Sequence, residues 1–488
     1  MKHGNFLKNV AVISLGGLIA KGIGVLYRIP LIGILGGYGM GLYQMAYPLF
    51  CVVLTFSSAG IPSAFSRLIA KETAQGRPCS DTVKTALKLF ALLGLCGTLL
   101  MCLFAPYMSR LQNEQNLFPC YLALAPSVFF VAMIAVFRGY FQGKNNMVPT
   151  ALSEIVEQVF KAGSGLYFAY RYSDDPVRAV MFSLLAVTVS EIAAFLYLLL
   201  RYRGERKVKS LRVMKTSGGE IFSNAFPVMA SAALLPLSQT VDSILIIRLL
   251  SGHTTRAVTL YGLFSGGAIG LINVPAALCY GLAAASVPAV SACFAKGKEE
   301  EGRLRAMYSL GFTLLFAVPC AIALFFLAGP IVDLVYSSLS AEDAALLVRL
   351  VRLSSVSAVT LAGVDTLAAC LTGMGRAKRA ALSMLVAVIV KFALQWALVG
   401  NPALSIGGAA IASNVCYLVA FSLDLFYTVK RTKNKKGRMN YDRDRKFGNG
   451  KRGFEYARSG SNPSGGQSLA ANGLAPVCRK RARNGRGV

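Results

Sequence analysis

Hydrophobic residues occur along this chain in runs of about 20, separated by short polar or charged breaks. Runs such as 87–104, 180–200 and 307–328 carry at most one charge each. A helix of about 20 apolar residues crosses the ~30 Å hydrocarbon core of a bilayer. The pattern predicts an all-α polytopic membrane protein with about twelve spans, which centre near residues 20, 55, 95, 130, 160, 190, 236, 275, 317, 358, 390 and 418.

Basic residues gather in alternate loops between these spans. One side of the membrane holds the N-terminal residues, the strongly basic loop at 201–215 and the tail that follows Lys430, whereas the other side holds few Lys or Arg residues. Positively charged loops stay in the cytoplasm, so the protein is predicted to lie in the cell membrane with both termini on the cytoplasmic side. An odd number of spans would break this alternation, which favours twelve.

The composition agrees with this class of protein. Of 488 residues, 55% are hydrophobic and 15% are charged, against roughly 25% charged in an average soluble domain. The net charge of +29 lies in the basic loops and in the tail from Lys430, which has 17 Lys and Arg residues against three acids. We therefore predict no nucleic-acid partner. The tail is predicted to be disordered, either as a solvated anchor or attracted to anionic membrane lipids.

The eleven cysteines stand singly, mostly inside apolar runs, and the chain has two histidines. Without a C-x-x-C pair, buried structural thiols are a better interpretation than disulfides or a metal site. We predict no metal and no cofactor. No loop is long enough for a catalytic domain, so an enzyme with catalytic residues is not predicted.

One sequence pattern occurs twice in the chain. Ala-Leu-Ser-x-x-Val-x-x-x-x-Lys fills residues 151–161 and returns at 381–391, and a weaker pair, 59–64 and 285–290, keeps the same order of spans. Because even spans match even spans, the two halves are predicted to be parallel repeats related by an axis along the membrane normal. The predicted parts are a six-helix bundle at 1–203, a basic linker at 204–218, a second six-helix bundle at 219–430 and a disordered basic tail at 431–488.

Three cations lie at positions that call for an explanation. Lys21 and Arg28 are seven residues apart, two turns along one face of the first span. A Lys near mid-membrane costs ~3 kcal/mol or more, so we predict that both residues face a polar cavity, although snorkelling to the surface is an alternative. Arg138 lies near the cytoplasmic end of the fourth span, where it could contact phosphate or only anchor the helix at the interface.

The fifth span carries charges of both signs. Glu154, Glu157 and Lys161 follow i, i+3, i+7 spacing and are predicted to share one helix face. Glu157 and Lys161 have the favourable i, i+4 spacing, which predicts an ion pair that partly neutralises the lysine.

In the second half, the repeat keeps the lysine as Lys391 but has no acid at the two matching positions. Lys391 is predicted either to pair with Asp242 or Asp365 on another helix or to bind an anionic ligand. This asymmetry makes Lys391 the preferred contact for substrate phosphate, with a structural salt bridge as the alternative. Asp242, Asp365 and Glu191 either couple an ion to transport or balance the cations.

Several stretches resemble the multidrug/oligosaccharidyl-lipid/polysaccharide (MOP) exporter superfamily, in particular its polysaccharide-transporter or stage V sporulation protein B type. They are Gly-Val-Leu-Tyr-Arg-Ile-Pro at 24–30, Ala-Gly-Ile-Pro-Ser-Ala-Phe-Ser-Arg at 59–67, and Arg-Gly-Tyr-Phe-Gln-Gly at 138–143 with Pro-Thr-Ala and Glu-x-x-Glu-Gln after it. The resemblance covers about residues 5–430. It implies two six-helix bundles around a central cavity and a role in peptidoglycan or spore-cortex assembly. Related lipid II flippases often continue with two further helices, where this chain has the basic tail.

The predicted function is a flippase that moves a polyprenyl-(pyro)phosphate-linked oligosaccharide from the inner to the outer leaflet through a cationic cavity, acting as a monomer and driven by the membrane potential or an ion gradient. The predicted substrate contacts are Lys21, Arg28, Arg138, Lys161 and Lys391, and the predicted ion-coupling or charge-balancing acids are Glu154, Glu157, Glu191, Asp242 and Asp365. The alternative is a multidrug/cation antiporter of the same superfamily. That function would favour carboxylates in the first span, and none occurs at 6–35.

Overall fold

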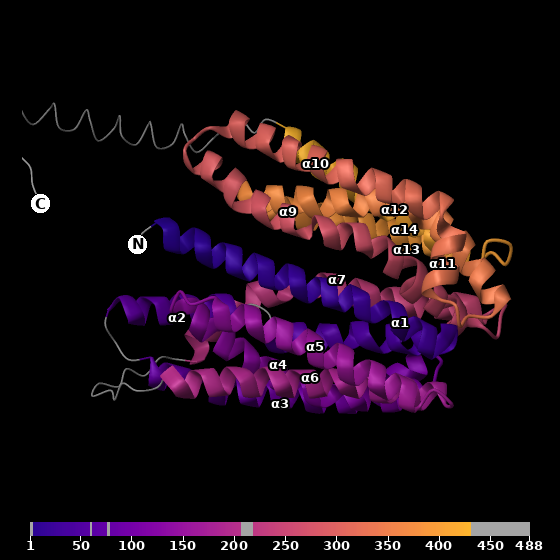
Figure 1. The fold of residues 1–488 in the computed structure, drawn as a ribbon, viewed down its shortest axis with the longest axis horizontal. Helices are drawn as coiled ribbons and strands as arrows, with labels where there is room; N and C mark the ends of the chain where they lie inside the picture. Colours follow the sequence, from indigo (N-terminus) through magenta and orange to yellow (C-terminus); the bar gives the residue numbers. More distant parts are fainter. Residues whose placement is uncertain (1–2, 59–60, 76–78, 206–217, 431–488) are drawn as a thin grey trace, which may run out of the picture. The chain divides into compact units, whose positions relative to one another are not determined.

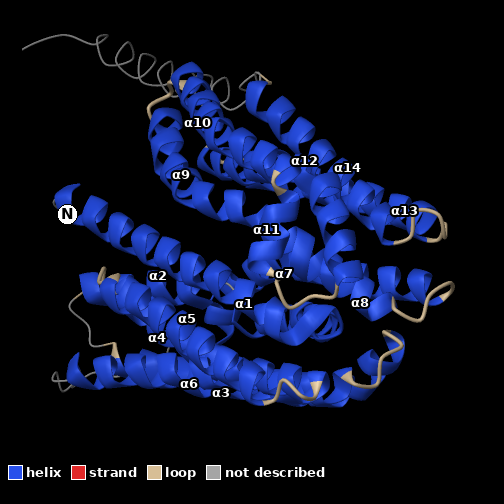
Figure 2. Ribbon diagram, turned by 45° about the vertical axis from the view of Figure 1, so that its right-hand side comes forward, coloured by secondary structure: helices blue, strands red, loops and turns tan. Residues whose placement is uncertain are grey.

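A computed structural model of the protein describes residues 3–58, 61–75, 79–205 and 218–430. The predictions for the tail and for most of the linker concern residues outside this description. The described residues form helices and no strand (Figure 2). In chain order these are α1 (His3–Ser58), α2 (Ile61–Ala74), α3 (Ser80–Leu111), α4 (Leu117–Gly143), α5 (Val148–Arg171), α6 (Pro176–Glu205), α7 (Gly218–Ser251), α8 (Ala257–Tyr261), the π-helix η1 (Gly262–Ala268), α9 (Ile269–Ala295), α10 (Glu299–Phe326), α11 (Ala328–Val335), α12 (Ala341–Gly373), α13 (Ala377–Val399) and α14 (Ile406–Val429).

The first long helix crosses the membrane twice. Its apolar part, Leu15–Ser58, has 44 residues, which at 1.5 Å per residue is about 66 Å, twice the thickness of a hydrocarbon core. Gly36 interrupts this helix with φ 66° and ψ −178°, a backbone conformation that residues other than glycine rarely adopt. Figure 1 shows the chain turning back, so that α2 lies near the N-terminal end of α1.

The number of crossings agrees with the predicted twelve. Among the described residues, nine helical stretches are long and apolar enough to span a membrane. The first of these counts twice because of the break at Gly36. Charged residues keep α5 out of that set, but α5 and α7, with 24 and 34 residues, are also long enough to cross. Large apolar side chains such as Leu103 of α3 and Phe316 of α10 are exposed, as expected for helices that face lipid.

The helices form two groups with α7 between them. In the first group, α5 packs on α6 and α1, and α4 packs on α3 and α6; in the second, α12 packs on α9, α10 and α14, and α13 packs on α14. α7 contacts α1 and α2 as well as α13 (Figure 1). Segments distant in sequence therefore meet along α7.

The two groups share a packing feature that supports the parallel repeat. A side-chain carbon added to Gly143, at the end of α4, would lie 2.6 Å from Cβ of Ile69 in α2. One added to Gly373, at the end of α12, would lie 2.8 Å from the carbonyl oxygen of Val287 in α9. In both halves, a terminal glycine thus lets a helix pack closely against an earlier one.

The groups are held together at the end of the molecule farther from the N-terminus. A side-chain carbon added to Gly41 of α1 would lie 2.2 Å from the carbonyl oxygen of Val258 in α8, and one added to Gly262 of η1 would lie 2.1 Å from the carbonyl oxygen of Gly37. We call this contact between Gly37, Gly41, Val258 and Gly262 the glycine seam. It closes this end through backbone-to-backbone packing that a larger residue would prevent.

Candidate functional site

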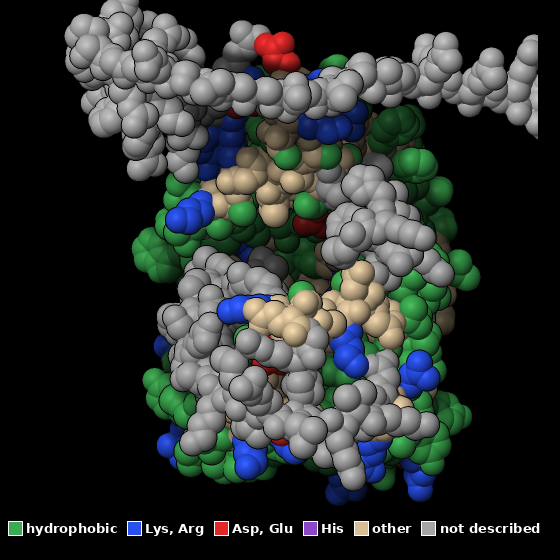
Figure 3. Space-filling model, turned by 90° about the vertical axis from the view of Figure 1, so that its left-hand side faces the viewer, with side chains coloured by type: hydrophobic (Ala, Val, Ile, Leu, Met, Phe, Trp, Pro, Cys, Tyr) green, Lys and Arg blue, Asp and Glu red, His purple; other side chains and the backbone are tan. Residues whose placement is uncertain are grey.

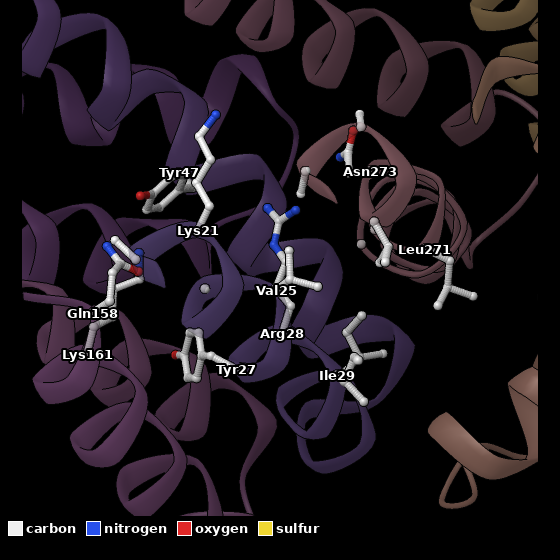
Figure 4. A pocket seen from close by; sticks show the side chains of 18 of the residues that line it. Lys21, Val25, Tyr27, Arg28, Ile29, Tyr47, Gln158, Lys161, Leu271 and Asn273 are labelled. Atoms are coloured by element: carbon white, nitrogen blue, oxygen red, sulfur yellow. The ribbon is translucent and has the colours of Figure 1, made fainter. Parts of the chain in front are cut away.

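A cavity of about 570 Å³ lies between the two helix groups, and residues of α1, α4, α5, η1, α9 and α12 line it. Figure 4 shows Lys21 and Arg28 of α1 between Lys161 on one side and Asn273 on the other. The charged residues of the wall are Lys21, Arg28, Arg138, Glu154, Glu157, Lys161 and Asp365. All seven belong to the ten site residues predicted from the sequence.

The cavity extends toward the end of the molecule where the N-terminus lies. Arg138 and Glu154 line it, and they lie within two turns of the end of α4 and the start of α5, respectively. Figure 3 looks onto this end and shows a recess between the helix groups with Lys and Arg side chains on both sides of it. The glycine seam lies at the opposite end, where the two helix groups pack closely against each other.

Lys21 and Arg28 both line the cavity, which is where the sequence predicted them to lie. Asp365 of α12 lies close enough to Lys21 for the two opposite charges to attract each other. The wall therefore joins a cation of the first half to an acid of the second half.

Arg28 is linked by hydrogen bonds to the closed end of the cavity. One of its guanidinium nitrogens donates to Oε1 of Gln44 at 3.2 Å, and Nε2 of Gln44 donates to the carbonyl oxygen of Ser265 in η1 at 2.9 Å. Gln44 is buried. This chain of bonds connects a cavity residue of the first half to the π-helix of the second half.

The prediction of an ion pair between Glu157 and Lys161 is wrong. Glu157 pairs instead with Arg138 of α4, with Nη2 to Oε2 at 3.0 Å, and Nε of Arg138 donates to Ser153 at 2.9 Å. A pair within one helix contributes only ~0.3–0.5 kcal/mol, whereas an arginine held between helices needs a charged partner. Glu154, Glu157 and Lys161 still share the predicted face, since all three line the cavity.

Because Glu157 pairs with Arg138, the ammonium group of Lys161 is available to a ligand in the cavity. Its ammonium lies 5.6 Å from the centre of the Tyr47 ring, a cation–π distance, and it forms no ion pair within 4 Å with any described residue. Tyr43 stacks on Tyr47 with ring centroids 5.7 Å apart. The cation therefore lies over the Tyr47 ring, which is one of two stacked aromatic rings at the cavity wall.

Lys391 lies outside the cavity wall. Its ammonium pairs with Asp242 of α7, which is one of the two partners that the sequence named. The two side chains are 13% and 11% exposed. The ion pair uses Oδ2 of Asp242, and the buried Oδ1 has no hydrogen-bond partner among the described residues. The preferred role of Lys391 as a phosphate contact stays a prediction, and its position next to Asp242 corresponds to the structural alternative.

Glu191 also lies behind the wall. It is a buried residue of α6, 6% exposed, and the charges of Glu157, Arg138 and Lys161 act on it. Its predicted charge-balancing role fits this position, because two cations and one acid surround it.

Sequence reasoning missed the neutral polar residues of the site: Gln44, Tyr27, Tyr43, Tyr47 and Asn273. A uniform apolar pattern does not show which polar side chains of a span face inward. The i, i+4 spacing of Tyr43 and Tyr47 was the available signal, because residues at this spacing meet on one helix face.

The family described as "Polysaccharide biosynthesis protein" has a sequence model that matches residues 6–294, more than half of the chain. The chain belongs to this family. A second family model, MatE, matches residues 227–397.

Two curated relatives and one solved structure extend this result. Stage V sporulation protein B of Bacillus subtilis (strain 168) is 28% identical over 431 residues, which cover 84% of this chain and 81% of the relative. The lipid II flippase MurJ of the same organism is 22% identical over 453 residues, 87% of this chain and 82% of the relative. An inward-facing multidrug resistance MATE family transporter of the MOP superfamily shares the fold with a TM-score of 0.69 at 14% identity, over 83% of this chain and 93% of that chain.

This polysaccharide biosynthesis family member is therefore a multi-pass membrane transporter of the MOP superfamily, as its motifs indicated. The relatives whose names state an activity are a flippase and a transporter, and neither is an enzyme.

Proposed function

We propose that the protein moves a polyprenyl-(pyro)phosphate-linked oligosaccharide, a cell-wall or polysaccharide precursor such as one of the lipid II type, from the inner to the outer leaflet. The observation that carries this proposal is the charge of the cavity wall, where Arg28 and Lys161 form no ion pair with a described residue. A pyrophosphate headgroup in a low-dielectric cavity needs such cations, because an unpaired buried charge is prohibitive. The flippase activity stated in the name of one relative supports the same substrate class.

The residues of the wall take different parts in this proposal. Lys21, Arg28 and Lys161 contact the phosphates. Arg138 positions the headgroup at the mouth of the cavity, since Glu157 and Ser153 hold its guanidinium. The rings of Tyr43 and Tyr47 offer a flat apolar surface, which suits a sugar ring.

Transport in this proposal follows alternating access. The bundles at 1–203 and 219–430 move relative to each other, the end that bears the N-terminus faces the cytoplasm, and the glycine seam opens to release the substrate outside. A phosphate bound to Arg28 would compete with Gln44 for the guanidinium. Loss of the Arg28–Gln44 bond would weaken the attachment of Gln44 to η1 and so favour opening of the seam.

Headgroup flipping by purified protein in proteoliposomes tests the proposal. Arg28→Gln and Lys161→Gln each remove one charge-assisted contact, so we expect flipping to fall by about tenfold or more. Lys88→Gln, which changes an exposed lysine of α3, is the matched control and should flip at the wild-type rate. Wild-type rates in both cavity variants would contradict the anionic-substrate proposal.

A multidrug/cation antiporter is a second candidate, favoured by two acids of the wall. Glu154 forms no ion pair with a described residue, and Asp365 faces Lys21 across the two halves. Glu154→Gln and Asp365→Asn would abolish cation efflux by an antiporter, whereas headgroup flipping would persist in a flippase. Comparison of the two assays on the same variants decides between the functions.

A further inference from the structure

A second cavity, of about 650 Å³, lies at the end of the molecule farther from the N-terminus and is separate from the site described above. Residues of α8, α10, α12 and α14 and of the loop at 403–405 line it. Its volume is within the range of small-molecule sites. The proposed transport function does not involve this second cavity.

Two arginines are the charged residues of this wall. Arg349 and Arg352 of α12 are three residues apart, on one face of the helix. Neither forms an ion pair with a carboxylate in the part of the chain that the structure describes, and no acid lines the cavity. The remaining lining is mainly apolar and includes Leu353, Val356 and Ile411.

The depth of the arginines argues for an anionic partner. α12 has 33 residues, about 50 Å, so a helix centred on the ~30 Å core extends about 10 Å beyond each face. Arg349 is eight residues from the start of α12, about 12 Å, and therefore lies at the boundary of the hydrocarbon. Arg352 lies one turn deeper, where a cation needs a counter-charge.

The shape of the lining indicates what supplies that charge. Val356 is 58% exposed and Leu353 is 36% exposed, so the apolar part of the cavity is open sideways, toward the lipid. A soluble anion would leave this apolar wall uncovered. A lipid covers it with its chain and places its phosphate at the arginines.

We propose that this cavity is a binding site for an anionic phospholipid, with the phosphate held by Arg349 and Arg352 and part of an acyl chain against Leu353, Val356 and Ile411. The site is independent of the proposed transport substrate, because it lies outside the central cavity. The bound lipid would occupy the leaflet at the end of the molecule that bears the glycine seam.

Native mass spectrometry of the purified full-length protein tests this, with phosphatidylglycerol and phosphatidylcholine of identical chains as probes. We expect one phosphatidylglycerol to be retained at least about tenfold more tightly than phosphatidylcholine, and R349Q/R352Q to remove that preference. R110Q/R171Q removes two exposed arginines from the same end of the molecule and should leave the preference unchanged. Equal retention of both lipids by the wild type would overturn the proposal.

Two further variants separate lost binding from lost folding. R349K/R352K keeps both charges but not the forked donors, and we expect intermediate retention. Gly407→Phe fills the apolar part, since a side-chain carbon there meets only Leu353 at 3.9 Å, and it should weaken retention with both arginines present. Wild-type retention by a folded R349Q/R352Q, or equal losses in R110Q/R171Q, would refute the site.

Discussion

At the scale of single residues, two ion pairs between helices decide which charges remain available. Arg138 pairs with Glu157, and Lys391 pairs with Asp242. Removing one member of such a pair leaves the other charge without compensation in a low-dielectric site. Arg28 and Lys161 line the cavity without an acidic partner among the described residues, which makes them the cations that a ligand can use.

Arg138→Gln is expected to lower the stability of the detergent-solubilised protein by about 1–3 kcal/mol, because it leaves the Glu157 carboxylate without its charged partner. Thermal unfolding of the purified protein measures this. Glu154→Gln is the matched control on the same face of α5, and we expect a change within about 0.5 kcal/mol. Equal effects of the two substitutions would show that the Arg138–Glu157 pair adds no stability.

Lys391→Met alone and Asp242→Leu alone are each expected to destabilise the protein by about 3–5 kcal/mol, since each leaves one buried charge. The double variant should recover most of that stability, because two well-packed apolar side chains replace the pair. Thermal unfolding of all three variants, followed by a flipping assay, measures both roles of Lys391. A stable but inactive double variant would support Lys391 as a phosphate contact, and an active one would establish the structural role.

At the scale of helices, the glycine seam and η1 form the element that would move in the proposed transport cycle. The seam packs backbone against backbone, and η1 is a π-helix of seven residues, a rare form that is frequent at functional sites. Its carbonyl at Ser265 receives the hydrogen bond from Gln44. The same short segment therefore takes part in the seam and accepts the bond that leads to Arg28.

Gly41→Ala is expected to shift the protein toward the state that is open at the seam. The added carbon would lie 2.2 Å from the carbonyl oxygen of Val258, and relieving such overpacking is worth about 1–3 kcal/mol, a population change of about 5- to 150-fold.

In a cysteine-free background, the labelling rate of a cysteine at Val25, in the cavity wall, measures this shift. The membrane-impermeant thiol reagent is added at the side of the seam. Gly311→Ala on α10, where an added carbon meets nothing within 4 Å, should not change the rate. Unchanged labelling in Gly41→Ala would mean that the seam does not limit opening.

At the scale of the whole molecule, the transporter has positive charges around the N-terminal end and in its central cavity. Lys and Arg side chains lie on both sides of the recess at the N-terminal end (Figure 3), and the cavity wall has four cations and three acids. A membrane potential acts on such a molecule with ~2.3 kcal/mol per charge per 100 mV. An inside-negative potential would drive an anion outward and return the empty, positive cavity inward.

We therefore expect flipping in proteoliposomes to accelerate when a potassium diffusion potential makes the cytoplasmic side negative. The movement of one net charge through 100 mV corresponds to an acceleration of up to about fiftyfold. Reversing the sign of the potential should slow flipping. A rate that is independent of the imposed potential would exclude this source of energy and leave an ion gradient.

Most of the fold was predictable from the sequence. A helix that satisfies its own backbone hydrogen bonds is one of the few structures that can cross a bilayer, and the thickness of the bilayer sets its length. Twelve crossings therefore follow from the apolar runs. The double crossing of α1 follows from a run that is too long for one span.

The site was predictable only in part. Lys21 and Arg28 could be predicted because a cation within a bilayer is costly and usually faces a cavity or an opposite charge. Both residues line the cavity. The sequence does not show how each helix is rotated about its axis. It therefore did not predict that Gln44 links Arg28 to η1, or that Tyr47 lies beneath Lys161.

The sequence by itself determined the helical class, the crossings, the repeat and the identity of the charges within the membrane, because these depend on local composition and on bilayer thickness. Only the tertiary structure decided the partners. Glu157 turns to Arg138 of another helix, and Lys161 of the repeat remains in the cavity while its counterpart Lys391 pairs with Asp242. Which acid pairs with which cation depends on contacts between helices that are distant in sequence. A charge removed from water between such helices needs an opposite charge close to it, so the nearest one becomes its partner.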